Sequence, residues 1–404
     1  MKNNRVAWLM QSGIEGMTEA DLLSGFCTRC AVSRVPVERA SAVIEALHPM
    51  YERRALRWDA NNALERMSEF GMGTGGSLAM NWERTAFFHL RTTGDIEVRR
   101  RFSRGDAADF YLLDSMKADG FTDFVALAHR FGGNGTIGEI DCFFSQVATR
   151  APGGFSEADL NALKALVPCL ALATKCVAMS GVARTIAKVY LGEDAAQHVL
   201  HGEMRRDRAD RIAAALWFSD LANFTRISDL SDPDEIIPMI NDYAEAVISS
   251  VKTAGGEVLK LMGYGTLAIF GGATAQKACE AALRGRFVLE RELVDLNARR
   301  RIEGRAVTEV YLGLHFGDVF YGNIGGRERL DFTVIGPAVN EVSRINSLCR
   351  SLDRKLLVSS QFASALNPDQ GSILLSLGAH TLRGVSRPQE LFTIPQCEHA
   401  MATA

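Results

Sequence analysis

The chain has 404 residues, of which 47% are hydrophobic and 23% are charged, and its formal net charge is −3. This composition excludes an intrinsically disordered chain, because the apolar content is high and the net charge is low. It also argues against a broad nucleic-acid-binding surface, since there is no basic excess to neutralise many phosphates.

The first 178 residues predict a domain of mixed helices and strands. We expect helix through the first 55 residues, because Thr18 begins one amphipathic run and residues 37–47 carry apolar side chains at helical spacing. From Arg84 the pattern favours strands, expected at residues 85–90, 124–129 and 139–147. A helix with Ser156 as its N-cap then follows.

We expect no membrane span and no signal peptide. The most apolar helical run, residues 165–174, lies between Lys164 and Lys175 and is interrupted by Pro168. It is far shorter than the roughly 20 apolar residues that a span requires. The eight cysteines are scattered, a pattern typical of reduced thiols, so the expected location is the cytoplasm.

Residues 179–211 are predicted to be a helical, charged linker. A helix is expected from Arg184 to Leu200, and a dense run of charges follows over residues 203–211. Such a run is typical of a solvated face, and the alternative interpretation is a helix that couples the two halves.

Residues 212–396 predict an α+β domain, followed by a tail over 397–404. Strands are expected at 212–219 and 330–335, and hairpins at 257–261 with 266–270 and at 307–316 with 319–324. Helices are expected at 233–251, at 275–297 and from Pro337. This order predicts a sheet covered by helices.

One carboxylate directly follows a predicted buried strand. Asp220 precedes a short polar turn that leads to Phe224 and Thr225. A hard divalent cation prefers such an oxygen ligand, and turn amides can hold phosphate oxygens. An aspartate after a strand is also common as a simple cap.

Three segments, residues 218–225, 256–270 and 321–344, together form a recognisable pattern. In order and spacing they resemble the catalytic domain of class III adenylyl/guanylyl cyclases, of the bacterial subclass that reads the base with threonine. The resemblance covers about residues 212–396. It implies a ferredoxin-like fold and a head-to-tail dimer with active sites at the interface. It also implies attack of the ribose 3′-oxygen on the α-phosphate, which yields a 3′,5′-cyclic nucleotide and pyrophosphate.

The resemblance assigns roles to individual residues. Asp220 matches the first metal-binding aspartate, and Lys260 and Thr333 match the pair that reads the base. A lysine donor suits N1 of adenine, and a threonine oxygen can accept from the exocyclic amine. Guanine presents the reverse pattern at these atoms, so the pair favours ATP over GTP.

Asn340 and Arg344 match the transition-state pair of the family and lie four apart on one predicted helix. Arg344 would balance charge on the α-phosphate, and Asn340 would orient the ribose. Arg383 or Arg387 is expected at the terminal phosphates, where the family uses a lysine.

The sequence departs from the family pattern at two turns. Tyr264 stands where the second metal-binding aspartate is expected, and a neutral phenol with a pKa of about 10 is a poor ligand for Mg²⁺. Asn223 stands where glycine is usual, and asparagine tolerates left-handed backbone.

Three alternatives follow from Tyr264. The chain is a weak or inactive homodimer, a pseudocyclase that keeps its nucleotide pocket. Or it is active, with Mg²⁺ or Mn²⁺ held by Asp220 and another oxygen donor. Or it contributes its base-reading and transition-state residues to a heterodimer with a cyclase that brings both aspartates.

The N-terminal half resembles a GAF-like sensory domain. The resemblance rests on residues 122–128, 142–145 and 154–160, the last leading into a long helix. It implies a regulatory domain that receives an unidentified small-molecule or protein signal and passes it through the linker.

Three other patterns are not assigned a function. Cys27 and Cys30 form a lone CxxC without the further ligands that zinc requires. Residues 133–138 fit GxGxxG but precede a predicted strand, so they are interpreted as a hairpin loop. His315 is expected to pack inside the fold.

Overall fold

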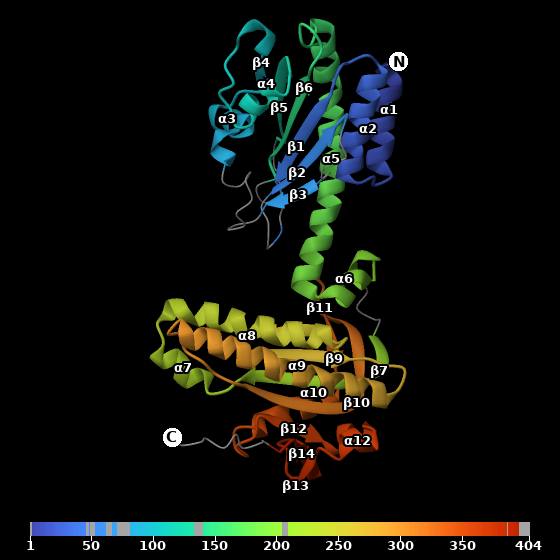
Figure 1. The fold of residues 1–404 in the computed structure, drawn as a ribbon. Helices are drawn as coiled ribbons and strands as arrows, with labels where there is room; N and C mark the ends of the chain where they lie inside the picture. The colour runs from blue at the N-terminus through green and yellow to red at the C-terminus, as the bar shows by residue number, and fades with distance from the viewer. Residues whose placement is uncertain are drawn as a thin grey trace. The chain divides into compact units, whose positions relative to one another are not determined.

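The computed structural model describes residues 2–45, 48, 53–61, 67–70, 81–132, 140–203, 209–385 and 387–395. The chain divides into two compact units, Met1–Ile186 and Ala187–Ala404. They are called the N-terminal and C-terminal units below, and Figure 1 shows their elements. The predicted GxGxxG loop and the tail after residue 396 lie outside the described residues.

The N-terminal unit is built on a six-stranded antiparallel sheet in the order β3-β2-β1-β6-β5-β4. Its strands are β1 (Arg39–Glu45), β2 (Arg53–Asp59), β3 (Met67–Phe70), β4 (Glu97–Arg100), β5 (Asp123–Arg130) and β6 (Cys142–Thr149). Its helices are α1 (Lys2–Ile14), α2 (Glu19–Val32), α3 (Ala86–Thr93), α4 (Leu113–Ala118) and α5 (Glu157–Leu191), with short 3₁₀ turns at Trp82–Arg84 and Phe102–Arg104. One apolar core lies among α1, α2, α5 and the sheet, and a second involves α3 and α4.

Two predictions for this unit are wrong. The expected helix over residues 37–47 is strand β1, which pairs with strands on both sides and is largely buried. A strand covered on both faces is apolar throughout, so its periodicity does not separate it from a buried helix. The expected strand at 85–90 is helix α3, whose N-cap Thr85 accepts a hydrogen bond from the amide of Phe88.

The strands expected at residues 124–129 and 139–147 are confirmed as β5 and β6, although β6 begins only at Cys142. The helix start predicted at Ser156 is also confirmed, since its hydroxyl accepts from the amide of Asp159. That helix, α5, is longer than expected and continues without interruption through Pro168.

Pro168 therefore does not end the apolar run, contrary to the sequence prediction. Leu163, Leu166, Val167 and Leu170 pack into the core on both sides of it. This packing outweighs the cost of about 3 kcal/mol for an internal proline. Within the described residues, α5 alone is long and apolar enough to cross a membrane, and 44% of its most apolar window is buried in the structure. A buried core helix passes the same test, so this is weak evidence for a span.

The C-terminal unit is built on an eight-stranded sheet, with the main order β13-β14-β12-β10-β7-β9-β8 and β11 paired to β10. Its strands are β7 (Ala209–Leu221), β8 (Glu257–Met262), β9 (Gly265–Phe270), β10 (Val310–Gly325), β11 (Leu330–Ile335), β12 (Leu356–Ser359), β13 (Leu375–His380) and β14 (Gln389–Thr393). Its helices are α6 (Glu193–Leu200), α7 (Phe224–Leu230), α8 (Pro233–Thr253), α9 (Ala275–Ile302), α10 (Pro337–Leu348), α11 (Ser360–Ala365) and α12 (Pro368–Gly371). The succession β7-α8-β8-β9-α9-β10, with spatial order β10-β7-β9-β8, is the ferredoxin-like arrangement.

The second predicted hairpin, 307–316 with 319–324, is wrong: this segment is the single long strand β10. Gly317 does not turn the chain. A side chain there would come within 2.8 Å of the Cβ of Ala338 on α10, so this glycine permits close helix packing. The hairpin forms one strand later, between β10 and β11.

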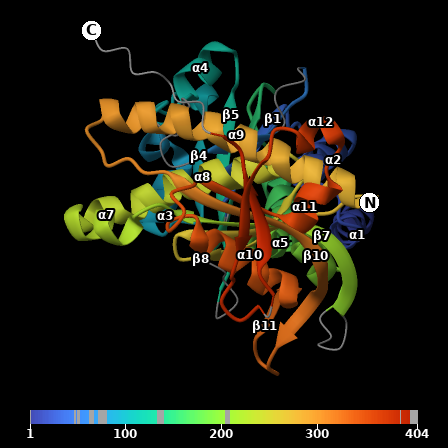
Figure 2. The same cartoon turned by 90° about the horizontal axis from the view of Figure 1, so that it is seen from below.

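Helices cover both faces of this sheet. Helices α8 and α9 lie side by side on one face (Figure 1), and α10 packs on the other together with β11 (Figure 2). Along β7, Ala215 and Trp217 pack in the apolar core beneath α8 and α9, whereas Ala214 and Leu216 pack in the core beneath α10. Alternation along a strand therefore directs Asp220 to the α10 face.

Candidate active site

Asp220 lies at the end of β7, opposite Tyr311 of β10 and Gly265 of β9. Its Oδ1 atom is buried and has no hydrogen-bond partner among the described residues. Burial raises the pKa of Asp220 to about 6, and a hydrogen bond from Asn346 partly offsets that rise. A buried carboxylate oxygen without a partner is costly, which makes it a candidate ligand for a cation.

Tyr264 lies in the β8–β9 turn, one residue before the glycine that pairs with Asp220. Its ring stacks on Phe224, with centroids 4.5 Å apart, and the side chain is 42% exposed. Asp220 and Tyr264 also border a cavity of about 70 Å³ at the end of β7, whose other lining comes in largest part from α8. The structure thus places Tyr264, which stands where the family pattern has its second aspartate, close to Asp220.

The turn between Asp220 and α7 contains a left-handed residue at Asn223, where the family pattern usually has glycine. Asn223 adopts left-handed backbone with φ 54°. This agrees with the prediction, since asparagine tolerates this conformation better than other non-glycine residues do. Phe224 and Thr225 begin α7 directly after it, where Phe224 is partly buried and Thr225 is exposed. Their roles toward phosphate stay predictions.

Lys260 on β8 forms an ion pair with Asp331 on β11. Thr333 is two residues further along β11, so its side chain shares a face of that strand with Asp331. The structure therefore gathers an ammonium, a carboxylate and a hydroxyl. Asp331 is the member that sequence reasoning missed, although the residue lies inside one of the quoted motifs.

Asn340 and Arg344 are exposed on α10, within one turn of each other. The buried side of the helix carries Val342, Ile345 and Asn346. The amide of Asn346 donates to the carbonyls of Phe218 and Tyr311, next to Asp220. Asn346 is turned by about 200° from Arg344 on a helix of 3.6 residues per turn. The predicted transition-state pair thus points away from the Asp220 of its own chain.

Arg383 and Arg387 are both exposed in the segment between β13 and β14. Within the part of the chain that the structure describes, no hydrogen bond or ion pair joins either arginine to the other predicted residues. Both therefore stay predicted partners of the terminal phosphates.

His315 is buried, as expected, between Ser359 and Glu341. Its Nδ1 atom lies 2.9 Å from the Ser359 hydroxyl and its Nε2 atom 3.5 Å from a Glu341 oxygen. Burial lowers its pKa, and the neighbouring Glu341 opposes that shift. The neutral form is therefore favoured, which fits packing rather than a charged role.

A family model described as the adenylate and guanylate cyclase catalytic domain matches residues 207–395. The C-terminal unit is a class III nucleotide cyclase domain.

Curated relatives match the same part of the chain. An uncharacterized protein of Mycobacterium tuberculosis is 33% identical over 183 residues, which are 44% of this chain and 31% of that protein. An adenylate cyclase of Anabaena cylindrica is 30% identical over 163 residues, 39% of this chain and 32% of that protein. The chain thus spans about a third of the length of these relatives.

A crystal structure of the adenylyl cyclase CyaB from P. aeruginosa is also similar to this chain. The two sequences are 23% identical, and the match covers 48% of this chain and 98% of the CyaB chain with a TM-score of 0.43. The GAF-like assignment of the N-terminal half is not confirmed by these comparisons.

Cyclase domains of this family generally depend on a metal ion, and the donor set here fits one cation better than two. Asp220 supplies one carboxylate with a free buried oxygen, whereas Tyr264 supplies only a phenol. No group of three His, Cys, Asp or Glu side chains that could hold a metal occurs in the part of the chain that the structure describes. Magnesium often takes one or two carboxylates and completes its shell with substrate phosphates and water.

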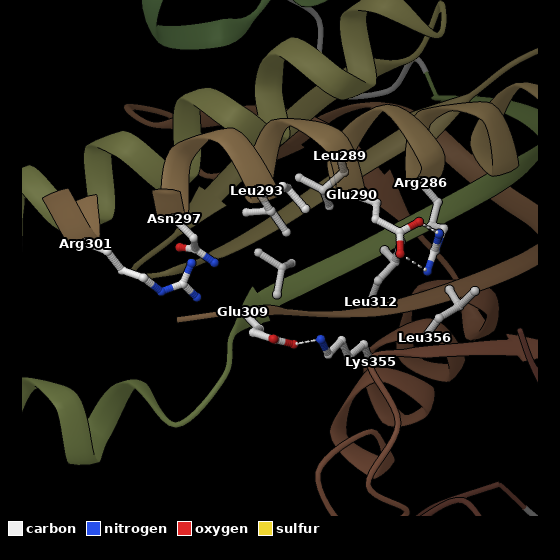
Figure 3. Close-up of a pocket in the computed structure, with 12 residues that line it drawn as sticks. Arg286, Leu289, Glu290, Leu293, Asn297, Arg301, Glu309, Leu312, Lys355 and Leu356 are labelled. Carbon is white, nitrogen blue, oxygen red and sulfur yellow. Dashed lines mark hydrogen bonds and ion pairs between the residues drawn. The ribbon is translucent and has the colours of Figure 1, made fainter. Parts of the chain in front are cut away.

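The cyclase domain also contains a larger cavity, of about 240 Å³, between α9 and strands β10 and β12 (Figure 3). Leu289, Leu293 and Leu312 form its apolar wall, and an ion pair joins Glu309 to Lys355 at its edge. None of the residues with predicted roles lines it. Cavity size alone therefore does not locate the chemistry in this protein.

Cys27 and Cys30 are buried on α2 in the N-terminal unit. Burial raises the pKa of Cys30 to about 11 and that of Cys27 well above its usual value. Both are therefore favoured as neutral thiols, in line with the interpretation of the CxxC as two ordinary cysteines.

Proposed function

We propose that the cyclase domain converts ATP to 3′,5′-cyclic AMP and pyrophosphate. The observation that carries this proposal is the position of Lys260 against the face of β11 that bears Thr333. An ammonium donor beside a hydroxyl acceptor complements N1 and the exocyclic amine of adenine. The ribose 3′-oxygen would then attack the α-phosphate, and pyrophosphate would leave.

We propose that each complete site is shared by two copies of the chain. Asp220 faces the sheet side of α10, whereas Asn340 and Arg344 occupy its exposed side. A residue that points outward can serve a site that a second molecule completes. This supports a homodimer, in which Arg344 of one protomer neutralises phosphate charge beside the Asp220 of its partner.

A divalent cation, Mg²⁺ or Mn²⁺, would be held by Asp220 and by phosphate oxygens of the nucleotide. When bound, such an ion supplies positive charge that polarises the α-phosphate. Asn340 would orient the ribose, and either Arg383 or Arg387 would bind the terminal phosphates. Lys260 and Thr333 would hold the base.

A second candidate function is that of a catalytically impaired nucleotide-binding partner. The observation that favours it is Tyr264, which packs on Phe224 instead of offering a carboxylate. Such a chain would act as a regulator, or as the half of a heterodimer that supplies Lys260, Thr333 and Arg344 to a relative with both aspartates.

Cyclic AMP formation by the full chain and by Tyr264→Asp, in Mg²⁺ and in Mn²⁺, tests the two candidates. We expect measurable turnover by the wild type and at least about tenfold more by Tyr264→Asp, since one correctly placed charge contributes on that scale. Tyr264→Phe is the matched control, because it keeps the ring stack and adds no ligand.

Each outcome of this experiment discriminates. Turnover by the wild type establishes an enzyme. Turnover only after the tyrosine is replaced by aspartate identifies the natural chain as an impaired cyclase or half of a shared site. If neither protein binds ATP or forms product while both are folded, the proposed function is wrong.

We further propose that the N-terminal unit is a GAF-like regulatory domain that works in the cytoplasm. Its support is helix α5, which begins in the core of the N-terminal unit and ends at Leu191, inside the C-terminal unit. One continuous helix could transmit a small-molecule or protein signal from one unit to the other.

A further inference from the structure

A short helical segment, residues 192–203, follows α5 and docks on the cyclase domain. It begins at Gly192, whose φ of 88° favours glycine. A Cβ at this position would lie 2.7 Å from a carboxylate oxygen of Glu257 and 3.0 Å from the carbonyl of Val258, both on β8. The chain therefore turns against the surface of β8 before α6 begins. This stretch, which contains α6, is called the α6 segment below.

Aromatic contacts join the α6 segment to β11. The ring of His198 stacks on Phe332, with centroids 5.1 Å apart and an interplanar angle of 17°. Tyr321 of β10 meets the same phenylalanine edge-on at 4.8 Å. Phe332 is buried, with 8% of its surface exposed, so this packing fixes the position of its side chain.

Hydrogen bonds tie the same segment to β8 and β10. The Tyr321 hydroxyl donates to Asp194 over 2.5 Å, and the amide of Asp194 donates to Glu257 on β8. The buried side chain of Asn323 donates to the carbonyl of Glu203. Burial and the contact with Asp194 raise the pKa of Tyr321 well above its usual range, so it remains a donor.

The two residues that flank Phe332 belong to the base-reading group. Asp331 and Thr333 point to the opposite face of β11, because successive side chains of a strand alternate. Asp331 is the ion-pair partner of Lys260. The α6 segment therefore contacts one side of the strand whose other side carries the groups assigned to adenine.

We propose that the α6 segment positions β11 for recognition of the base, with His198 and Tyr321 as positioning residues and Asp331 as a third base-site group that orients Lys260. This inference rests on the proposed function of the domain. The side chain of Phe332 links the α6 segment, which follows α5, to the proposed nucleotide pocket. Displacing the α6 segment would shift Phe332 and, with it, Asp331 and Thr333.

Competition binding on the full chain tests this inference. A fluorescent ATP analogue is displaced by ATP, by GTP and by inorganic tripolyphosphate, which has no base. His198→Ala loses the stack on Phe332 and the contact of Nδ1 with Glu203 inside the segment. We expect ATP to bind about two- to tenfold more weakly to this variant, the scale of one lost aromatic contact, while tripolyphosphate is unchanged. His198→Phe, which keeps a flat ring on Phe332, should restore the affinity for ATP.

His201→Ala is the matched control. His201 lies at the end of the same segment, and its ring hydrogen-bonds within that segment to the carbonyl of Gln197 rather than to β11, so its removal should change none of the three competitors. Tyr321→Phe, which loses the bond to Asp194, should reproduce the loss seen in His198→Ala.

Two results would overturn the inference. One is unchanged ATP and GTP affinity in folded His198→Ala and Tyr321→Phe. The other is an equal loss for all three competitors, which would indicate a general structural role. A wild-type chain that binds no nucleotide would instead reject the proposed function, and the inference with it.

Discussion

Asp220 is the residue of the site whose ionisation depends most directly on the fold. Burial raises its pKa to about 6, whereas the pKa of an aspartate in an unfolded chain is about 3.9. Between these values the folded protein binds more protons than the unfolded chain. The contribution of Asp220 to the free energy of unfolding therefore falls as the pH rises through this window and is constant above it.

We accordingly predict that Asp220→Asn stabilises the C-terminal unit at pH 7.5 but not at pH 4. The melting temperature at pH 7.5 should rise by about 2–4 °C, the shift that about 1 kcal/mol produces in a unit of this size. Circular dichroism at the two pH values measures it. Asp318→Asn removes an aspartate that is exposed and paired with Arg211, so it serves as the control. An equal gain at both pH values would contradict the titration argument.

At the scale of residues, the sequence predicted the conformation and burial of single residues better than the contacts between distant ones. The left-handed tolerance of Asn223 and the burial of His315 are confirmed. Asp331 was missed because its significance depends on Lys260, which lies 71 positions away in the chain. A motif records spacing along one strand, whereas such a contact depends on how two strands are brought together.

Among the elements, α10 divides its residues sharply between a buried and an exposed side. We predict that Arg344→Ala lowers turnover by about 10²–10³-fold, the effect of losing one group that stabilises transition-state charge. The melting temperature should stay unchanged because Arg344 is exposed in the single chain. The dimer fraction should also stay unchanged, because the proposed partner of Arg344 is the nucleotide phosphate and not a side chain of the other protomer. Ser347→Ala is the control on the same side of the helix. Its hydroxyl donates to the carbonyl of Ser343 on the same helix.

Steady-state kinetics and size-exclusion chromatography of the two α10 variants check this prediction. Comparable turnover in Arg344→Ala and Ser347→Ala would show that Arg344 is not the transition-state residue. A loss of dimer together with a loss of turnover would assign Arg344 to the interface itself.

Gly192 offers a second test at the level of an element. Gly192→Ala should loosen the α6 segment, because the new Cβ meets both a left-handed backbone and the surface of β8. Gly202→Ala carries a similar φ of 85° but has no atom within 4 Å of its new Cβ. Hydrogen exchange of residues 193–203 should therefore be faster in Gly192→Ala than in Gly202→Ala. Equal rates would mean that the close approach to β8 does not hold the segment.

Elements were predicted well where local chemistry decides them and poorly where packing decides them. The turn at Gly263 and the proline at the start of α10 fix their elements locally, and both were found. Gly317 and Asp318 suggest a turn within residues 310–325. These residues nevertheless form one strand, because β7 pairs with most of their length. Pro168 remains inside α5 for the same reason, since core contacts outweigh its local preference.

At the scale of the whole molecule, the shared site makes a prediction about mixtures of variants. An Asp220→Asn homodimer lacks the metal carboxylate in both sites, and an Arg344→Ala homodimer lacks the arginine in both. In a mixed dimer one site has lost both groups and the other has kept both. If subunits exchange freely at equal amounts, half the dimers are mixed and about a quarter of the parental activity returns.

Both variants are made on the background, wild type or Tyr264→Asp, that gives measurable turnover. Cyclic AMP formation is followed after the purified variants are mixed, with each variant alone as the baseline. Cross-linking of differently tagged copies measures the fraction of mixed dimers. Activity that rises in proportion to that fraction would confirm that Asp220 and Arg344 act from different protomers. No recovery despite abundant mixed dimers would place both groups in a site within one chain. The outward orientation of Arg344 on α10 would then have to change before catalysis.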